Sequence, residues 1–384
     1  MRRYAASNKK TRRKLMIEIT PKVEHGIVNR VTGTYFNYHG WPSVCKDSRG
    51  VLYAAASGMR LGHVDPTGKN CMYLSFDEGK TWTPPVVVND SYVDDRDTGI
   101  IAWNDGNMLM SWFSLRYEKD CDDMIWDWLP DAHKPLYKGF GGSWKFLSQE
   151  MNLQGSFVKL SNDYGVTWSE PIRVPVTSPH GPVALKDGTL VYMGKLMNPD
   201  YLAPNPICVY SSFDGGHTWE YTGTVPPGDD IIVDNMHEPH MIELPSGRLL
   251  GAIRIHERKS QPDFTVYTTY SDDKGKTWSK PVCIGVDGAP PHLMVHSSGA
   301  VICSYSRRRS ETDRGERAVV SYDNGETWAE DYVLKTDFKY GDHGYPASVE
   351  LSDGSIMTVY YMASEGDYNC SVLYTKWRLK EDNK

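Results

Sequence analysis

Short apolar runs separated by turn-forming residues recur along almost the whole chain. Within most runs apolar and polar residues alternate, which is the pattern of a β-strand that buries one face. Glycine, aspartate, asparagine and serine cluster between the runs, and these residues favour tight turns. The pattern therefore predicts an all-β chain of many short antiparallel strands.

One of these turns is repeated almost unchanged. Five segments fit the pattern S-x-D-x-G-x-T-W. In this pattern the aspartate can bond the backbone that follows it, the glycine supplies a positive φ, and the tryptophan can fill the gap beside the turn. We therefore interpret the segments, called Asp boxes below, as structural corners rather than catalytic sites. They are residues 75–82, 161–168, 212–219, 271–278 and 321–328.

A second turn recurs between the Asp boxes. Small polar residues followed by glycine precede an apolar run six times, ending at Gly50, Gly106, Gly188, Gly247, Gly299 and Gly354. The chain thus divides into six units, each with several short strands. Such repeats predict a six-bladed β-propeller with four antiparallel strands per blade. We expect the strand at residues 16–20 to complete the last blade and cover its open edge.

The second unit is longer than the others. From Gly106 to the next Asp box are 55 residues, against 25 from Gly50. We assign the excess to an insertion at about residues 114–149 in blade 2, rich in aspartate and tryptophan, with a short helix near residues 122–129. A lid over a sugar, a surface elaboration and a subunit contact are equally good interpretations. Residues 1–15 are expected to be a disordered basic tail, and residues 16–384 the propeller.

Charge and composition narrow the classes of function. The net charge of −7 becomes −14 without the seven Lys and Arg of residues 1–14, so we expect no binding of nucleic acid. No apolar run is long enough to span a membrane, and none follows the basic tail as in a secretory signal. The seven cysteines lack pairable spacing, which suits a reducing compartment. We expect a cytoplasmic protein without membrane contact, and the sequence leaves open whether it forms a homo-oligomer.

Candidate catalytic and binding residues lie at one rim of the predicted propeller. Because the strands alternate in direction, both kinds of turn fall on one rim, and the starts of the first strands and the ends of the second strands fall on the other. Histidine, arginine and carboxylates recur at this second rim, and convergent polar groups are typical of ligand pockets. The candidates are His39, Arg60, His63, Asp65, Arg96, Asp97, His180, His240, Arg254, His292 and Arg307.

The Asp boxes, the six units and the arginines and carboxylates of this rim resemble the sialidase superfamily over nearly the whole chain. The resemblance implies a tyrosine nucleophile, a glutamate that takes its proton, an aspartate as acid/base, and three arginines that clamp the substrate carboxylate. The segment EPHMIELPSGRLLGAIR is similar to the stretch from that glutamate to the second arginine, which implies these roles for Glu238 and Arg254.

The resemblance implies the remaining roles as well. The segment GYPASVELSDG is similar to the stretch around the nucleophile, so Tyr345 takes that place. Asp65 falls in the loop where the acid/base belongs. The third arginine should precede the fifth Asp box, where Arg317 or Arg314 is the match and Arg307 a further candidate.

The chain departs from the sialidase pattern at the first arginine. Sialidases open blade 1 with Arg-Ile-Pro, whereas this chain has Gly40, Trp41 and Pro42. Glycine cannot replace a bidentate guanidinium, and His39 offers only a single, pH-dependent donor. We therefore expect sialosides to be poor substrates, with His39 and Trp41 shaping a pocket for a neutral or uronic sugar. The motifs HVDPTG, DDRDTG and DHGYPASV resemble those of sialidase-like bacterial proteins.

Two classes of function follow from these residues. The first is an exo-acting glycoside hydrolase that removes a terminal sugar, a sialic acid or another acidic or deoxy sugar, from an oligosaccharide. In it Asp65 is the acid/base, or His39 or His180 as in rhamnosyl-glucuronate hydrolases. The second is a non-catalytic glycan-binding or scaffold propeller. No cofactor is implied, and no metal, because the segment HEPH at residues 237–240 is not the zinc motif H-E-x-x-H.

Overall fold

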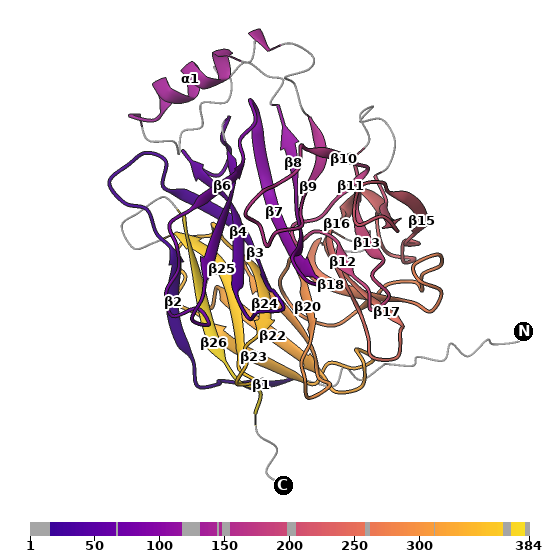
Figure 1. The fold of residues 1–384 in the computed structure, drawn as a ribbon. Helices are drawn as coiled ribbons and strands as arrows, with labels where there is room; N and C mark the ends of the chain where they lie inside the picture. Colours follow the sequence, from indigo (N-terminus) through magenta and orange to yellow (C-terminus); the bar gives the residue numbers. More distant parts are fainter. Residues whose placement is uncertain are drawn as a thin grey trace, which may run out of the picture.

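The computed structural model describes residues 16–66, 68–116, 131–143, 146–147, 154–197, 205–257, 262–310, 312–363 and 370–380. These residues form six sheets, and Figure 1 shows the sheets grouped around a common centre. Among the described residues four of the sheets have four strands and two have five, so the predicted six-bladed β-propeller is confirmed. The predicted tail at residues 1–15 and the predicted helix near residues 122–129 lie outside the described residues.

The strands follow the blades in chain order. Blades 1 to 3 contain β3 (Tyr38–Lys46), β4 (Leu52–Arg60), β5 (Lys69–Ser75), β6 (Val86–Asn89), β7 (Asp94–Trp103), β8 (Asn107–Leu115), β9 (Gly155–Ser161), β10 (Ile172–Val174), β11 (Val176–Thr177), β12 (Val183–Ala184), β13 (Leu190–Leu196), β14 (Ile207–Ser212) and β15 (Glu220–Thr224). Blades 4 to 6 contain β16 (Met236–Glu243), β17 (Leu249–Glu257), β18 (Pro262–Ser271), β19 (Val282–Cys283), β20 (His292–Val295), β21 (Val301–Arg307), β22 (Gly315–Ser321), β23 (Glu330–Lys335), β24 (His343–Glu350), β25 (Ile356–Ala363) and β26 (Cys370–Trp377).

Two N-terminal strands close the ring, and here the prediction is corrected. The strand expected to complete the last blade is β1 (Ile17–Ile19), but it pairs in parallel with β23 of blade 5. The last blade is completed instead by β2 (Glu24–Asn29), which pairs antiparallel with β26. The longer β2 provides the antiparallel partner that β26 requires, while the short β1 covers the edge that blade 5 would otherwise expose.

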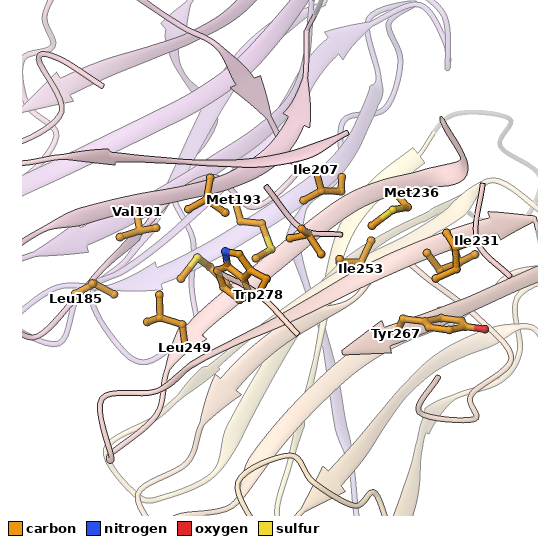
Figure 2. Close-up of a cluster of buried hydrophobic side chains, with 14 residues drawn as sticks. Leu185, Val191, Met193, Ile207, Ile231, Met236, Leu249, Ile253, Tyr267 and Trp278 are labelled. Atoms are coloured by element: carbon orange, nitrogen blue, oxygen red, sulfur yellow. The ribbon is translucent and has the colours of Figure 1, made fainter. Parts of the chain in front are cut away.

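Neighbouring blades are joined by apolar side chains, as one cluster shows (Figure 2). Trp278, the last residue of the fourth Asp box, packs between Val191 and Met193 of blade 3 and Leu249 of blade 4. Its indole Nε1 donates a hydrogen bond to the carbonyl of Gly275 in the same turn, at 2.9 Å. The tryptophan therefore fills the gap beside its own turn, as predicted from the repeat.

The aspartate of this Asp box is satisfied by its own turn. Asp273 Oδ1 accepts hydrogen bonds from Ser271 Oγ at 2.8 Å and from the backbone N–H of Thr277 at 2.9 Å. Asp273 Oδ2 accepts a hydrogen bond from Thr277 Oγ1 at 2.6 Å. The hydrogen bonds from Thr277 lower the pKa of Asp273 to about 2. All of these partners belong to the turn itself, so we assign the Asp273 carboxylate a structural role.

Two adjacent aspartates allow a matched test of this structural role. We expect Asp273→Ala to lower the free energy of unfolding by about 1–3 kcal/mol, because three hydrogen bonds to a charged group are lost. The control is Asp272→Ala, whose side chain is 70% exposed and pairs with Arg248 at 2.7 Å, so that about 1 kcal/mol or less is expected. Chemical denaturation measures both values. Equal losses in the two variants, or a loss of turnover in folded Asp273→Ala, would contradict the assignment.

The two kinds of turn meet on one rim, which leaves the other rim for the site. The carboxylate of Glu78, in the first Asp box, accepts a hydrogen bond at 3.0 Å from the backbone N–H of Ser352, in the last glycine turn. Lys274, in the fourth Asp box, pairs with Asp187 of the third glycine turn at 2.8 Å. The first strands therefore start, and the second strands end, on the opposite rim, as the sequence predicts.

The blade 2 insertion reaches that opposite rim. Its described part includes α1 (Lys134–Ser143), which lies outside the sheets in Figure 1. The Tyr137 hydroxyl of α1 donates a hydrogen bond to the carbonyl of Val64, and the Tyr137 ring packs on Leu61 in the connection after β4. The insertion thus covers the loop that carries Asp65. Among the described helices, none has the length and apolar character needed to cross a membrane.

Candidate active site

Four blades direct one side chain each toward the centre of this rim from the same place in the first strand. They are Trp41, Asp97, Glu238 and Tyr345, with φ values of 54°, 51°, 44° and 55°. The register of β3, β7, β16 and β24 is interrupted at these residues. A bulge re-aims the side chain that it carries, and left-handed backbone at residues other than glycine is costly and clusters at functional sites. The repeated bulge marks the four residues as one candidate site.

A hydrogen-bonded relay connects two of the four with an arginine. The Tyr345 hydroxyl donates to Glu238 Oε1 at 2.6 Å, and Arg254 Nη1 donates to Glu238 Oε2 at 2.5 Å. Burial alone would raise the pKa of Glu238, but the charge of Arg254 and the hydrogen bond from Tyr345 bring this pKa below its usual range. Glu238 is therefore ionised near neutral pH and can accept the proton of Tyr345. The structure brings together the three residues that the resemblance paired.

Burial and the charge of Glu238 determine the protonation state of Tyr345 in the free protein. Tyr345 is 6% exposed, and burial, together with the negative charges of Glu238 and Asp97, raises the pKa of its hydroxyl well above its usual value. The positive charges of Arg254 and Arg308 act in the opposite direction. The phenol is thus protonated in the free protein, and its proton can leave only as another charge appears nearby.

Arg308 lies beside Tyr345, where the sequence predicts Arg317, Arg314 or Arg307. Its guanidinium carbon lies 5.6 Å from the centroid of the Tyr345 ring. A Cβ atom added to Gly344 would lie 3.4 Å from Arg308 Cδ and 2.7 Å from Ser306 Oγ. Ser306 and Arg308 therefore face blade 6, as residues two apart on a strand should, and Arg307 between them faces away.

Two of the three arginines proposed from the sequence, Arg307 and Arg317, are held by other carboxylates. Arg307 pairs with Asp313 at 2.6 Å and with Asp287 at 3.5 Å. Arg317 pairs with Asp331 at 2.9 Å and with Glu18 of β1 at 3.0 Å. These ion pairs hold both guanidinium groups on carboxylates of blade 5 and its flanking segments, and neither group has a described contact with Tyr345. Successive side chains of a strand point to opposite faces, so counting two residues on from Ser306 would have selected Arg308 rather than Arg307.

A carboxylate from the start of blade 6 lies beside the start of blade 1, where the chain has Gly40 at the place that the sialidase resemblance gives to the first arginine. We call the group of Tyr38, Trp41, His63, Asp342 and Tyr361 the Asp342 corner. Asp342 accepts hydrogen bonds from the hydroxyls of Tyr38 and Tyr361, both at 2.9 Å, and contacts His63 Nδ1 at 3.0 Å. Burial would raise the pKa of Asp342, but the hydrogen bonds from His63 and Tyr361 bring this pKa well below its usual range. Asp342 is therefore ionised, and His63, Tyr361 and Arg308 stabilise its charge.

Trp41 and two arginines form the wall beside the Asp342 corner. The guanidinium carbons of Arg60 and Arg96 lie 4.9 Å and 4.4 Å from the Trp41 ring centroid. Arg60 is fully buried and forms a bidentate ion pair with Asp94, with distances of 2.5 Å and 3.0 Å. Arg60 thus supports the wall and has no free face for a substrate. Arg96 lies 3.5 Å from the same carboxylate of Asp94 and is partly exposed.

Asp65 and the predicted catalytic histidines lie below the surface of the site. Asp65 is fully buried, and its Oδ2 accepts a hydrogen bond from the backbone N–H of Leu61. His39 is also fully buried and contacts the Tyr73 hydroxyl at 2.6 Å, within blade 1. Burial lowers the pKa of His39 to about 3. His39 is therefore neutral and does not shape the pocket, contrary to the prediction.

Three further histidines from the sequence prediction fill the axis of the propeller. The rings of His240 and His292 stack at 4.3 Å, and His180 meets their faces edge-on at 5.6 Å and 4.9 Å. Burial lowers the pKa of each of the three. Neutral, stacked rings suit packing better than proton transfer or metal binding. Within the described ranges, no cluster of three or more His, Cys, Asp or Glu side chains could hold a metal ion.

The sequence of residues 140–358, more than half of the chain, matches the family described as BNR repeat-like domain. A protein of unknown function from Dyadobacter fermentans has a similar structure, with a TM-score of 0.72, 21% identity, and coverage of 93% of this chain and 99% of that one. The NanB sialidase from Streptococcus pneumoniae gives a TM-score of 0.67 at 16% identity, covering 92% of this chain and 70% of that one. The intramolecular trans-sialidase from Ruminococcus gnavus gives a TM-score of 0.64 at 15% identity, covering 92% of this chain and 97% of that one. No curated protein matches. At these identities the solved structures show the shared fold.

Proposed function

The chain belongs to the BNR repeat-like domain family, and from this premise we propose that it is an exo-acting glycoside hydrolase with Tyr345 as its nucleophile. The observation that carries the proposal is the relay in which Tyr345 donates to Glu238 at 2.6 Å and Arg254 holds the other oxygen of that carboxylate. A nucleophile with its base in hydrogen-bond reach, and a third group that orients the base, is the arrangement of covalent catalysis.

The reaction then runs in two steps. Glu238 takes the proton of Tyr345 as the phenolate oxygen attacks the anomeric carbon, and the bond from that carbon to the leaving oxygen breaks. Water attacks the glycosyl-tyrosine in the second step, and Glu238 returns its proton to the departing phenolate. Arg254 and Arg308 stabilise the negative charge that develops on Tyr345, because both lower the pKa of its hydroxyl.

The position of the site favours attack at the end of a sugar chain. The site lies where the first strands converge, and beneath it the axis is filled by His180, His240 and His292, which are 1%, 6% and 7% exposed. We therefore expect a sugar to enter from the rim. A site closed on one side suits a terminal residue.

The ionised carboxylate of the Asp342 corner disfavours a sialic acid as the terminal sugar. A sialic acid would place its carboxylate where a sialidase has the first arginine, and in this chain Asp342 already brings a negative charge to that region. Like charges in a desolvated site repel, and one charged hydrogen bond to the substrate is also lost. The side chains of Asp342 and His63, which are 29% and 37% exposed, are instead suited to the hydroxyl groups of a neutral or deoxy sugar.

A panel of 4-methylumbelliferyl glycosides, with neutral, deoxy, uronic and sialic acid sugars, tests this proposal. We expect hydrolysis of at least one glycoside that is not a sialoside. The sialoside should be slower by roughly tenfold to hundredfold, which corresponds to the loss of one charged hydrogen bond, about 1.5–3 kcal/mol. Glu238→Gln is the control for contaminating activity. No hydrolysis by the folded protein would favour the non-catalytic glycan-binding propeller, and efficient sialoside cleavage would overturn the interpretation of the corner.

A further inference from the structure

Among the described residues, Asp97 differs from the other carboxylates around Tyr345 in accepting no hydrogen bond from the protein. Glu238 is bound by Tyr345 and Arg254, and Asp342 by the residues of its corner. Among the described residues, by contrast, no side chain or backbone N–H donates a hydrogen bond to the Asp97 carboxyl group. A polar group held at a strained bulge without a hydrogen-bond donor from the described protein is suited to a hydrogen bond with the substrate.

The position of Asp97 places it with the reacting groups. Its bulge on β7 is equivalent to the bulges that carry Glu238 and Tyr345. Its charge raises the pKa of the Tyr345 hydroxyl, and the charge of Glu238 in turn raises the pKa of Asp97. The three groups therefore share one electrostatic environment at the centre of the rim.

The surroundings of Asp97 favour a carboxyl group that keeps its proton. The residue is 8% exposed, and burial is the main cause that raises the pKa of Asp97 to about 7. Arg96 and Arg60 lower this pKa, and Glu238 and Asp94 raise it. Arg60 already forms its ion pair with Asp94, so its effect on Asp97 is largely offset. Asp97 is thus a neutral acid in mildly acidic solution and becomes a base near neutrality.

Asp65, the aspartate that the family resemblance suggests for proton transfer, is less suited to it in this chain. Asp65 is fully buried, its Oδ2 accepts a hydrogen bond from the Leu61 backbone, and α1 packs on the same loop through Tyr137. A carboxyl group that is fully buried beneath a helix has little access to a glycosidic oxygen at the rim. Asp97 is 8% exposed and accepts no hydrogen bond from a described residue.

We propose that Asp97 is the acid/base residue of this site, an assignment that rests on the proposed function. As the glycosidic bond breaks, its electron pair stays on the leaving oxygen, and the Asp97 carboxyl group gives that oxygen its proton. In the second step the Asp97 carboxylate takes a proton from the water that attacks the anomeric carbon. Asp97 ends the cycle protonated, Glu238 ends it ionised, and one water has been consumed.

Leaving groups of different basicity test this assignment. A 2,4-dinitrophenyl glycoside needs no proton to leave and a methyl glycoside does, so both are made of the sugar that the panel identifies. We expect Asp97→Asn to lose about 10²-fold or more on the methyl glycoside and less than about tenfold in the first step on the dinitrophenyl glycoside. Asp65→Asn is the matched control and should change both rates by one common factor. The proposal would be overturned if Asp65→Asn lost rate on the methyl glycoside alone, or if Asp97→Asn lowered the rates on both glycosides by one common factor.

A readout without turnover separates this assignment from the proposed function. At pH 6 the infrared spectrum of the wild-type protein should contain a protonated carboxyl band that is absent from Asp97→Asn. The band should disappear as the pH rises through about 7, together with the wild-type kcat/KM for the methyl glycoside. A protein that hydrolyses nothing in the panel overturns the proposed function. A hydrolase whose spectrum lacks the band overturns the role of Asp97 alone.

Discussion

Tyr345→Phe should lower kcat on every glycoside that the protein hydrolyses by on the order of 10³-fold or more, because the variant has no oxygen to attack the anomeric carbon. The ring is retained, so its packing against Tyr361 at 6.0 Å is kept. The hydrogen bond to Glu238 is lost, which leaves that carboxylate with Arg254 as its partner. Substrate binding should therefore change far less than turnover. The measurement is kcat and KM on the best glycoside of the panel.

A neighbouring tyrosine provides the matched control for this substitution. Tyr360 is fully buried on β25, and its hydroxyl makes one hydrogen bond, at 3.0 Å, to Thr375 Oγ1. Tyr360→Phe removes the same atom as Tyr345→Phe, from a side chain that does not contact the relay. We expect its kcat to stay within about tenfold of the wild-type value and its stability to fall by about 1 kcal/mol. A similar loss of kcat in both variants would show that Tyr345 acts through folding rather than chemistry.

Asp94→Ala should be the most destabilising single change near the site. Asp94 and Arg60 are both fully buried and joined by two hydrogen bonds, at 2.5 Å and 3.0 Å. Removing the carboxylate leaves the guanidinium buried without its charge partner, which costs about 3–5 kcal/mol. Loss of the Arg60 position would also loosen Trp41, whose ring lies 4.9 Å from that guanidinium. Thermal and urea unfolding measure the change.

An exposed ion pair serves as the reference for Asp94→Ala. Asp90 pairs with Lys69, and its side chain is 51% exposed. Asp90→Ala should therefore cost about 1 kcal/mol or less. The double variant Arg60→Met, Asp94→Leu should recover part of the stability that Asp94→Ala loses, because neither member of the pair is left as an unpaired buried charge. Equal stability of Asp94→Ala and Asp90→Ala would contradict the view that this ion pair holds the wall of the site.

The repeated turns made the fold predictable from the sequence. An Asp box such as residues 271–278 specifies a corner through its own hydrogen bonds, so five copies and six glycine turns were enough to count the blades. The closing strand was misplaced because β1 and β2 are both short segments near the N-terminus. Which sheet edge such a segment joins depends on register and distance in space, and neither is written in its pattern.

The candidate site was predictable only in part, because strand faces decide which side chains meet. Glu238 and Tyr345 stand in segments long enough to carry a family resemblance, and the structure brings them together. Arg307 and Arg308 are adjacent and therefore point to opposite faces of the strand, so an assignment that is wrong by one residue selects the wrong face. His39 and Trp41 should share a face by alternation, but the bulge at Trp41 redirects one of them. A bulge is a backbone feature that apolar periodicity does not reveal.

Trapping the covalent intermediate tests the central claim most directly. The protein is incubated with the 2-deoxy-2-fluoro glycosyl fluoride of the sugar that the panel identifies, which forms a glycosyl-enzyme quickly and hydrolyses it slowly. Peptide mass spectrometry then locates the added sugar. We expect one sugar per protein, attached to Tyr345, and none on Tyr345→Phe or after unfolding before incubation. A sugar attached to another residue, or none while the wild-type protein is an active hydrolase, would contradict the role of Tyr345 as nucleophile.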